Sequence, residues 1–378
     1  MSPVYLDYNA TAPIRPEAAE AVARALALGG NPSSIHASGR AARGVVEQAR
    51  AQVAKLVGAT SETLIFTSGG TEASALAIDS AALDDDVRRL VVGATEHDSV
   101  LEAARATGLP VDVWPVDADG VADLDWLRDR LAGWDAADGR PFVALMAANN
   151  ETGVIQPVAE AAEIVQAADG LLHVDAVQAA GKVAVHLCGL MADTLAVSAH
   201  KLGGPQGVGA LAYGPRATIR RRQHGGGQER GLRAGTENVA GIAGFGAAAA
   251  AVDLAAAAAQ AAWRDAAAER LRREGGVRIA GEGAARLPNT LCFAAADYPS
   301  SLQVMSLDLD GVMVSAGSAC SSGKVRPSAV LTAMGFGSLA EGALRASGGW
   351  ASTEDDWRRF AGAWLQVHAR RASRASAA

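Results

Sequence analysis

Short apolar runs alternate with longer segments of helical composition from residue 17 to residue 213. Apolar runs bounded by turn residues are typical of buried strands, and the longer segments between them favour helices. We expect strands at 64–66, 90–93, 111–114, 142–146, 171–174, 195–197 and 208–213, and helices at 17–28, 38–57, 73–82, 99–107, 123–131 and 158–168. This alternation predicts an α/β fold with a mainly parallel central sheet covered by helices.

The pattern changes near residue 258. We interpret the alanine-rich stretch 247–262 as part of one long helix that continues through 263–273, with short strands from Val277 onward. A chain of 378 residues is typical of two domains rather than one. The predicted division is a large domain at 11–258 and a smaller α+β domain made of 1–10 and 259–378.

Composition and charge narrow the class of protein. Hydrophobic residues make up 49% of the chain, but no uninterrupted apolar run approaches the ~20 residues needed to span a bilayer. The formal net charge of -7 argues against a nucleic-acid-binding surface. Because no basic region precedes an apolar core at the N-terminus, we expect no secretory signal and a cytoplasmic location. Neither a membrane nor a direct nucleic-acid partner is expected.

The three cysteines show no paired spacing that predicts a metal site or a disulfide framework. Cys188 and Cys292 lie in apolar segments, where cysteine is typically a small core residue. Cys320 lies among small and polar residues that predict an exposed loop, and a cation such as Lys324 favours the thiolate. From this context alone, Cys320 is either an incidental surface thiol or a functional one.

Polar residues follow five of the predicted strands. The carboxyl ends of parallel strands meet at one edge of a sheet, where α/β folds bind their ligands. The five clusters are Gly70-Thr71, Glu96-His97, Asn149-Asn150, Asp175, and Ser198 with His200 and Lys201. Their common position predicts a single site.

The residue types in these clusters point to pyridoxal 5'-phosphate (PLP). Desolvation of a lysine such as Lys201 makes its amine available for Schiff-base chemistry. Asp175 directly follows a buried strand and needs a cation, which a protonated pyridine nitrogen supplies. His97 can stack on a ring, and the glycine turn at Gly70 and Thr71 begins a helix that can bind a phosphate. Each residue alone is compatible with an ordinary structural role, but together they describe a PLP site.

Nearly the whole chain resembles the PLP-dependent cysteine desulfurases of the class V aminotransferase family, in the branch related to the bacterial iron-sulfur and nitrogen-fixation enzymes. The matching segments are 5–11, 31–36, 66–72, 149–153, 173–178, 198–201, 225–230 and 235–238. The resemblance implies the type I fold of PLP-dependent transferases and a homodimer.

The resemblance also implies a role for each residue of the site. Lys201 is expected to bond covalently to PLP, Asp175 to pair with the pyridine nitrogen, and His97 to stack on the ring and exchange protons. The residues implied near the ring hydroxyl are Asn150 and Gln178, and those implied at the phosphate are Gly70, Thr71, Ser198 and His200, with Thr236 from the other subunit.

Arg345, together with Asn150, is implied to bind the substrate carboxylate, which suits the bidentate fork of its guanidinium. The chain departs from the pattern of the family at two positions. Tyr8 stands where many relatives have an asparagine, and Gly348 follows Ser347 where a leucine is usual.

Residues 318–323 are similar to the loop that carries the persulfide-forming cysteine in these enzymes. Cys320 is therefore implied to attack the sulfur of L-cysteine, which leaves L-alanine and a persulfide on the enzyme. The persulfide would pass to an iron-sulfur scaffold or another sulfur-acceptor protein.

Two other functions remain open. A selenocysteine lyase or another class V enzyme would use the same cofactor, and the loop with Cys320 argues against an aminotransferase but not against a selenium substrate. A cofactor-free sulfur carrier would use Cys320 alone, and the purified protein would then be colourless and insensitive to borohydride.

Overall fold

The structure is a computed structural model that describes residues 3–317 and 328–375. Within these ranges the largest sheet has seven strands, in the order β2-β8-β7-β6-β5-β3-β4. The strands are β2 (Leu64–Thr67), β3 (Leu90–Gly93), β4 (Val111–Trp114), β5 (Phe142–Met146), β6 (Leu171–Asp175), β7 (Thr194–Ser198) and β8 (Gly209–Tyr213). β8 runs antiparallel to both neighbours, and the other neighbouring pairs are parallel. The predicted mainly parallel sheet is confirmed.

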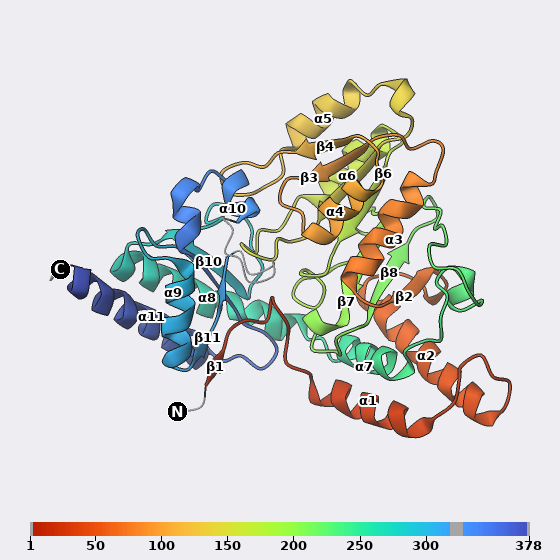
Figure 1. The fold of residues 1–378 in the computed structure, drawn as a ribbon, viewed down its shortest axis with the longest axis horizontal. Helices are drawn as coiled ribbons and strands as arrows, with labels where there is room; N and C mark the ends of the chain where they lie inside the picture. Colours follow the sequence, from red (N-terminus) through yellow and green to blue (C-terminus); the bar gives the residue numbers. More distant parts are fainter. Residues whose placement is uncertain (1–2, 318–327, 376–378) are drawn as a thin grey trace.

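Helices cover both faces of this sheet (Figure 1). They are α1 (Pro16–Leu28), α2 (Ala37–Leu56), α3 (Gly70–Ala82), α4 (Asp98–Ala106), α5 (Leu124–Ala132), α6 (Val158–Ala167) and α7 (Val239–Ala250). Successive residues of a strand point to opposite faces. Val143 and Leu145 of β5 pack in the core with α2, α5 and α6, whereas Phe142 and Ala144 pack with α3 and α4. The uninterrupted apolar runs of the sequence are therefore strands buried on both sides.

The alanine-rich stretch is not one continuous helix, although the predicted helix at 263–273 is confirmed. α7 ends at Ala250, α8 (Leu254–Gly275) begins after a short break, and the two helices are bent by 71°. The side chain of Asp253 accepts hydrogen bonds from Ala255 N and Ala256 N at 2.9 and 3.0 Å. An N-cap residue has non-helical backbone, so Asp253 starts a new helix instead of continuing the previous one. No single described helix is long and apolar enough to cross a bilayer, and α7 and α8 pass that test only as a bent pair.

A second core surrounds a four-stranded antiparallel sheet. Its strands, in order, are β12 (Ser315–Ala316), β13 (Ala343–Ser347), β10 (Thr290–Ala294) and β9 (Arg278–Ile279). Phe293 of β10 packs edge-on against Trp364 of α11 (Glu354–Ala375), and both side chains are fully buried. β1 (Val4–Tyr5) pairs with β11 (Val312–Met313), so the first described residues join this region. The domain division at residue 258 stays a prediction.

The two cysteines within the described residues differ in exposure. Cys292 of β10 is fully buried, as its apolar segment predicts. Cys188 is exposed, and its predicted core position is wrong. Its main-chain oxygen accepts a hydrogen bond from Met191 N at 3.1 Å, so Cys188 lies in a surface turn rather than in the core.

Candidate active site

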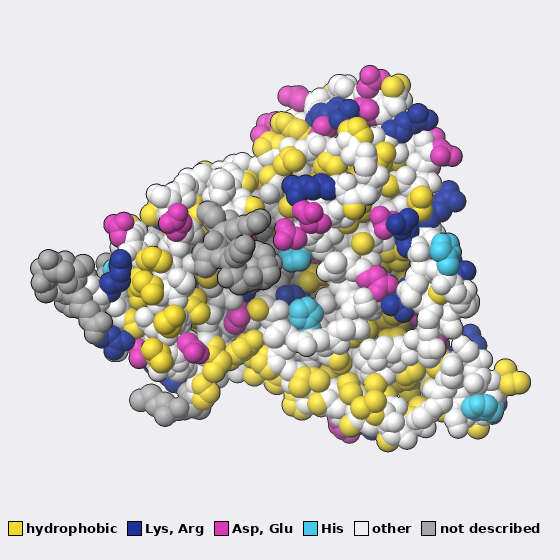
Figure 2. Space-filling model, viewed as in Figure 1, with side chains coloured by type: hydrophobic (Ala, Val, Ile, Leu, Met, Phe, Trp, Pro, Cys, Tyr) yellow, Lys and Arg dark blue, Asp and Glu magenta, His cyan; other side chains and the backbone are white. Residues whose placement is uncertain are grey.

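The carboxyl ends of the parallel strands border a pocket of about 390 Å³. The predicted site residues that line it are Gly70, Thr71, His97, Asn150, Asp175, Gln178, Ser198, His200, Lys201 and Arg345. Figure 2 shows a hollow on this face of the molecule with histidine and basic side chains inside it. The structure thus brings together residues that are far apart in the sequence, as the rule for parallel sheets predicts.

Thr236 lines a different pocket, together with Arg233 and Glu237. Cys320 lies outside the described residues.

Lys201 ends a short 3₁₀ turn, Ala199–Lys201, that directly follows β7. Its side chain is half-buried, and Nζ donates to the main-chain oxygens of Asn9 and Ala10 at 2.5 and 2.8 Å. Because carbonyl oxygens have no acidic proton and carry no full charge, they orient the amine without forming an ion pair. These two hydrogen bonds therefore hold the Lys201 amine at the wall of the pocket.

Asn9 is a site residue that sequence reasoning missed. Its main-chain oxygen also accepts from Gln178 Nε2 at 3.0 Å, and its side-chain Oδ1 accepts from Lys182 Nζ at 2.9 Å. On the other side, Asn9 Nδ2 donates to Asn150 O at 3.1 Å and to Thr290 Oγ1 at 2.9 Å. Asn9 thus connects Lys201 of the pocket and the buried Lys182 to the small antiparallel sheet. The only sequence signal was its place inside the matching segment 5–11.

Two buried acids lie at the centre of the strand ends. Burial raises the pKa of Asp175, and the hydrogen bond from Val177 N to its Oδ1 at 2.9 Å, His97 and Lys201 oppose this rise. Burial also raises the pKa of Glu96 well above its usual value, and the charge of Asp175 adds to that rise. Glu96 Oε1 accepts from Met146 N, while Oε2 has no hydrogen-bond partner among the described residues. Burial therefore favours the neutral form of Glu96, whereas the neighbouring His97 and Lys201 favour the charged form of Asp175.

The two histidines of the pocket are fixed by neighbouring residues. His97 is the N-cap of α4, and its Nδ1 accepts from Ser99 N at 3.0 Å, which places the proton of a neutral ring on Nε2. His200 Nδ1 lies 3.1 Å from Thr11 Oγ1. Burial lowers the pKa of His200 to about 4, and the charge of Lys201 adds to this effect. His200 can therefore serve as an uncharged hydrogen-bonding group at neutral pH.

Gly70 and Thr71 form the first turn of α3, which directly follows β2. The first N-H groups of a helix have no partner within it and attract anions. A Cβ at Gly70 would lie 2.6 Å from Val177 Cγ2 and 3.6 Å from Ser198 Cβ. Glycine therefore leaves the space beside Ser198 open for a bound anion.

Arg345 of β13 is almost fully buried, with 2% of its surface exposed. Nη1 donates to Asn150 O at 3.1 Å, and Nη2 donates to Asp7 Oδ1 at 2.9 Å. Its Nε has no partner among the described residues. Arg345 thus presents a fixed guanidinium to the pocket but already shares its charge with Asp7.

Comparison with known proteins connects this geometry to a family. Residues 4–360 match the family model described as aminotransferase class-V. The chain is similar to the cysteine desulfurase IscS of Dictyoglomus turgidum, with 40% identity over 372 residues that cover 93% of this chain and 91% of the relative. It is 43% identical to a cysteine desulfurase of Cereibacter sphaeroides over 362 residues, 92% of this chain and 91% of the relative. Among solved structures, a NifS-like protein superimposes with a TM-score of 0.88 at 35% identity and covers 97% of this chain and 99% of its own.

Proposed function

This chain belongs to the class V aminotransferase family and is a cysteine desulfurase, and we propose that it uses PLP bound at Lys201 and a persulfide on Cys320. Lys201, Asp175 and the first turn of α3 line one pocket, and this observation is the main support for the proposal. These groups complement an aldehyde, a cationic ring nitrogen and a phosphate, respectively.

The pocket residues suit the chemistry of PLP. The open space at Gly70 leads to the N-H groups of α3, and Thr71, Ser198 and His200 add side-chain donors for a phosphate. Asp175 is buried and has no ion-pair partner among the described residues, so a protonated ring nitrogen would offset the cost of its burial. When bound, PLP supplies an aldehyde that reacts with amines and a ring that withdraws electrons.

The residues of this chain position the substrate and move its protons. Arg345 and Asn150 bind the carboxylate of L-cysteine at the side of the pocket formed by β13. Lys201 Nζ, which Asn9 and Ala10 hold through carbonyl oxygens, takes and returns the proton at the substrate Cα. His97 carries its ring proton on Nε2 and exchanges it with the reacting thiol.

The described residues on either side of Cys320 lie beside the pocket. Ser315 of β12 pairs with Arg345, and Ser328 Oγ donates to Glu151 Oε2 at 2.6 Å. We infer that the Cys320 thiolate attacks the sulfur of L-cysteine to form a sulfur-sulfur bond. The electron pair of the broken carbon-sulfur bond stays on carbon, which takes up a proton and becomes L-alanine, and the outer sulfur remains on Cys320 as a persulfide.

Two further parts of the proposal concern protein partners. In a homodimer, Thr236 of the partner subunit would reach the phosphate, since Thr236 does not line the PLP pocket of its own chain. An iron-sulfur scaffold or another acceptor protein would then take the sulfur from Cys320. Persulfide transfer from the purified protein to candidate acceptors, measured by mass spectrometry, distinguishes these acceptors.

The variant Cys320→Ser tests the role of the persulfide. We expect the cofactor absorbance of this variant to respond to L-cysteine as in the parent protein, while sulfide release is lost. Cys188→Ser is the matched control, because Cys188 is an exposed thiol that does not line the pocket. Full sulfide release by Cys320→Ser would contradict the proposal.

A further inference from the structure

A second lysine, Lys182, lies buried behind the PLP pocket. Only 8% of its surface is exposed, and burial, with the charges of Lys201 and Arg345, lowers its pKa well below the ordinary value. Within the described part of the chain, Lys182 forms no ion pair with a carboxylate; its Nζ donates to Gln178 Oε1 at 2.6 Å and to Asn9 Oδ1 at 2.9 Å. A buried amine without a carboxylate costs stability, which points to a role at the neighbouring site.

The contact with Lys182 fixes the orientation of the Gln178 carboxamide. An amide group has one oxygen acceptor and one nitrogen donor, and Lys182 binds the oxygen. The nitrogen of Gln178 must then point away from Lys182, and it donates to Asn9 O at 3.0 Å. Two N-H groups on Nζ are enough for both contacts of Lys182, so the arrangement holds whether or not the amine carries a third proton.

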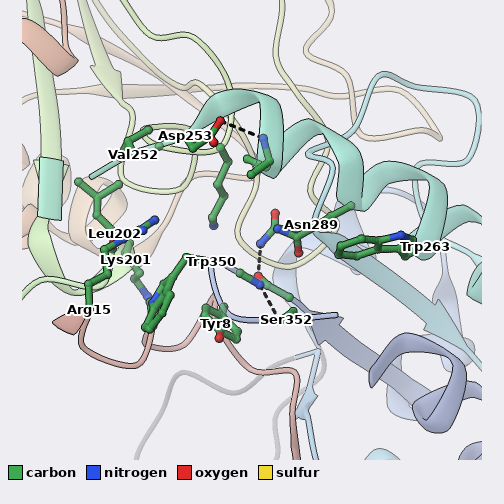
Figure 3. A pocket seen from close by; sticks show the side chains of 18 residues that line it. Tyr8, Arg15, Lys201, Leu202, Val252, Asp253, Trp263, Asn289, Trp350 and Ser352 are labelled. Carbon is green, nitrogen blue, oxygen red and sulfur yellow. Dashed lines mark hydrogen bonds between the residues drawn. The ribbon is translucent and has the colours of Figure 1, made fainter. Parts of the chain in front are cut away.

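A second pocket lies beside Lys182. Lys182 and Lys201 both line this pocket of about 320 Å³, which Tyr8, Asn289 and Trp350 also border. Figure 3 shows this pocket with Lys201 and Arg15 on one side and Asn289 and Trp263 on the other. Lys182 lines this second pocket and Gln178 does not, so removal of the Lys182 amine would leave the Gln178 oxygen without its donor.

We propose that Lys182 is a positioning residue for cofactor binding, because it holds the amide nitrogen of Gln178 as a hydrogen-bond donor at the PLP pocket. Lys182 does not line that pocket, whereas Gln178 does. The hydrogen bond to Asn9 Oδ1 braces the Lys182 amine from a second direction. This inference rests on the proposed function and on the position of Gln178 near the ring hydroxyl of PLP, which the family resemblance implies.

The test is a double-mutant cycle on PLP affinity, measured by titrating the full-length apoprotein with PLP and following absorbance. Lys182→Met keeps the aliphatic stem but removes the donors, and we expect about a tenfold loss of affinity. Lys182→Arg keeps the donors and should recover most of the affinity. In a Gln178→Ala background, Lys182→Met should cost less than about threefold, because the two residues act as one unit. Lys55→Met, at an exposed lysine of α2, is the matched control and should bind PLP like the parent.

Equal losses from Lys182→Met in both backgrounds would show a merely structural effect and would overturn the inference. Unchanged affinity in Lys182→Met would also overturn it. If that variant does not fold, Gln178→Glu decides the question, since a carboxylate keeps the contact with Lys182 but lacks the nitrogen. Gln178→Glu should lose about tenfold in affinity, because it loses the donor at the pocket together with the hydrogen bond to Asn9 O; parent-like affinity would contradict the inference. Failure of the parent protein to bind PLP would instead refute the proposed function itself.

Discussion

Arg345 donates from Nη2 to Asp7 Oδ1 at 2.9 Å, so the guanidinium proposed to bind the substrate is already part of an ion pair. The same group donates from Nη1 to Asn150 O at 3.1 Å. These two contacts hold the guanidinium plane in a fixed orientation at the pocket. A substrate carboxylate must therefore bind beside Asp7 or displace it from Arg345.

Arg345→Lys should raise the KM for L-cysteine at least about tenfold, because a lysine cannot form two parallel hydrogen bonds with a carboxylate. The affinity for PLP should change little, since Arg345 is assigned to the substrate. Alanine formation at varied L-cysteine, together with a PLP titration, measures both quantities.

Arg50→Lys is the control for that variant. Arg50 is buried and donates to both carboxylate oxygens of Glu229 at 2.7 and 2.8 Å, and it does not line the PLP pocket. Arg50→Lys should lower the unfolding temperature and leave KM unchanged. A parent-like KM in Arg345→Lys would contradict the assignment of Arg345.

Gly70→Ala should weaken PLP binding about tenfold or more. The added Cβ would lie 2.6 Å from Val177 Cγ2, and the stiff valine side chain cannot move without disturbing the space for the phosphate. Gly69→Ala is the matched control, because a Cβ at Gly69 meets no atom within 4 Å. Fluorescence titration of both apoproteins with PLP measures the difference; equal affinities would refute the proposed phosphate site.

Glu151 predicts a specific pH dependence of stability. Burial raises its pKa from 4.5 to about 7, against the opposing effects of Ser328 and Arg345. Between these two values the folded protein binds more protons than the unfolded chain, so stability is lost as pH rises from 4.5 through about 7. The shift corresponds to at most roughly 3 kcal/mol.

Glu151→Gln removes this titration while keeping an oxygen that can accept from Ser328. Urea unfolding at pH 5 and pH 7.5 should show a smaller loss of unfolding free energy in the variant than in the parent. The same pH dependence in both proteins would show that Glu151 does not titrate as described.

Much of the fold could be predicted because most of its strands are short apolar runs bounded by turn residues. The runs at 90–93, 111–114 and 142–146 have the predicted bounds in the structure. The break between α7 and α8 was missed because alanine favours helix on both sides, and a single capping residue, Asp253, decides where the second helix starts. One aspartate hardly changes the helical composition of such a stretch, but its side chain caps the first turn of α8 and so sets where that helix begins.

The site was predictable where its residues follow strands and unpredictable where they act through contacts between distant segments. Lys201, Asp175 and His97 each follow or end a strand of the large sheet. Asn9 and Lys182 depend on hydrogen bonds that join the N-terminal segment to residues after β6, and no local pattern marks such contacts. The roles of Cys320 and Thr236 stay predictions.

Covalent attachment of PLP to Lys201 can be measured directly. The purified protein is incubated with PLP, reduced with borohydride and digested, and the modified peptide is identified by mass spectrometry. We expect a reduced pyridoxyl adduct on Lys201 and none on Lys182, although both amines contact Asn9. An adduct on Lys182 in place of Lys201, or no adduct at all, would contradict the proposal.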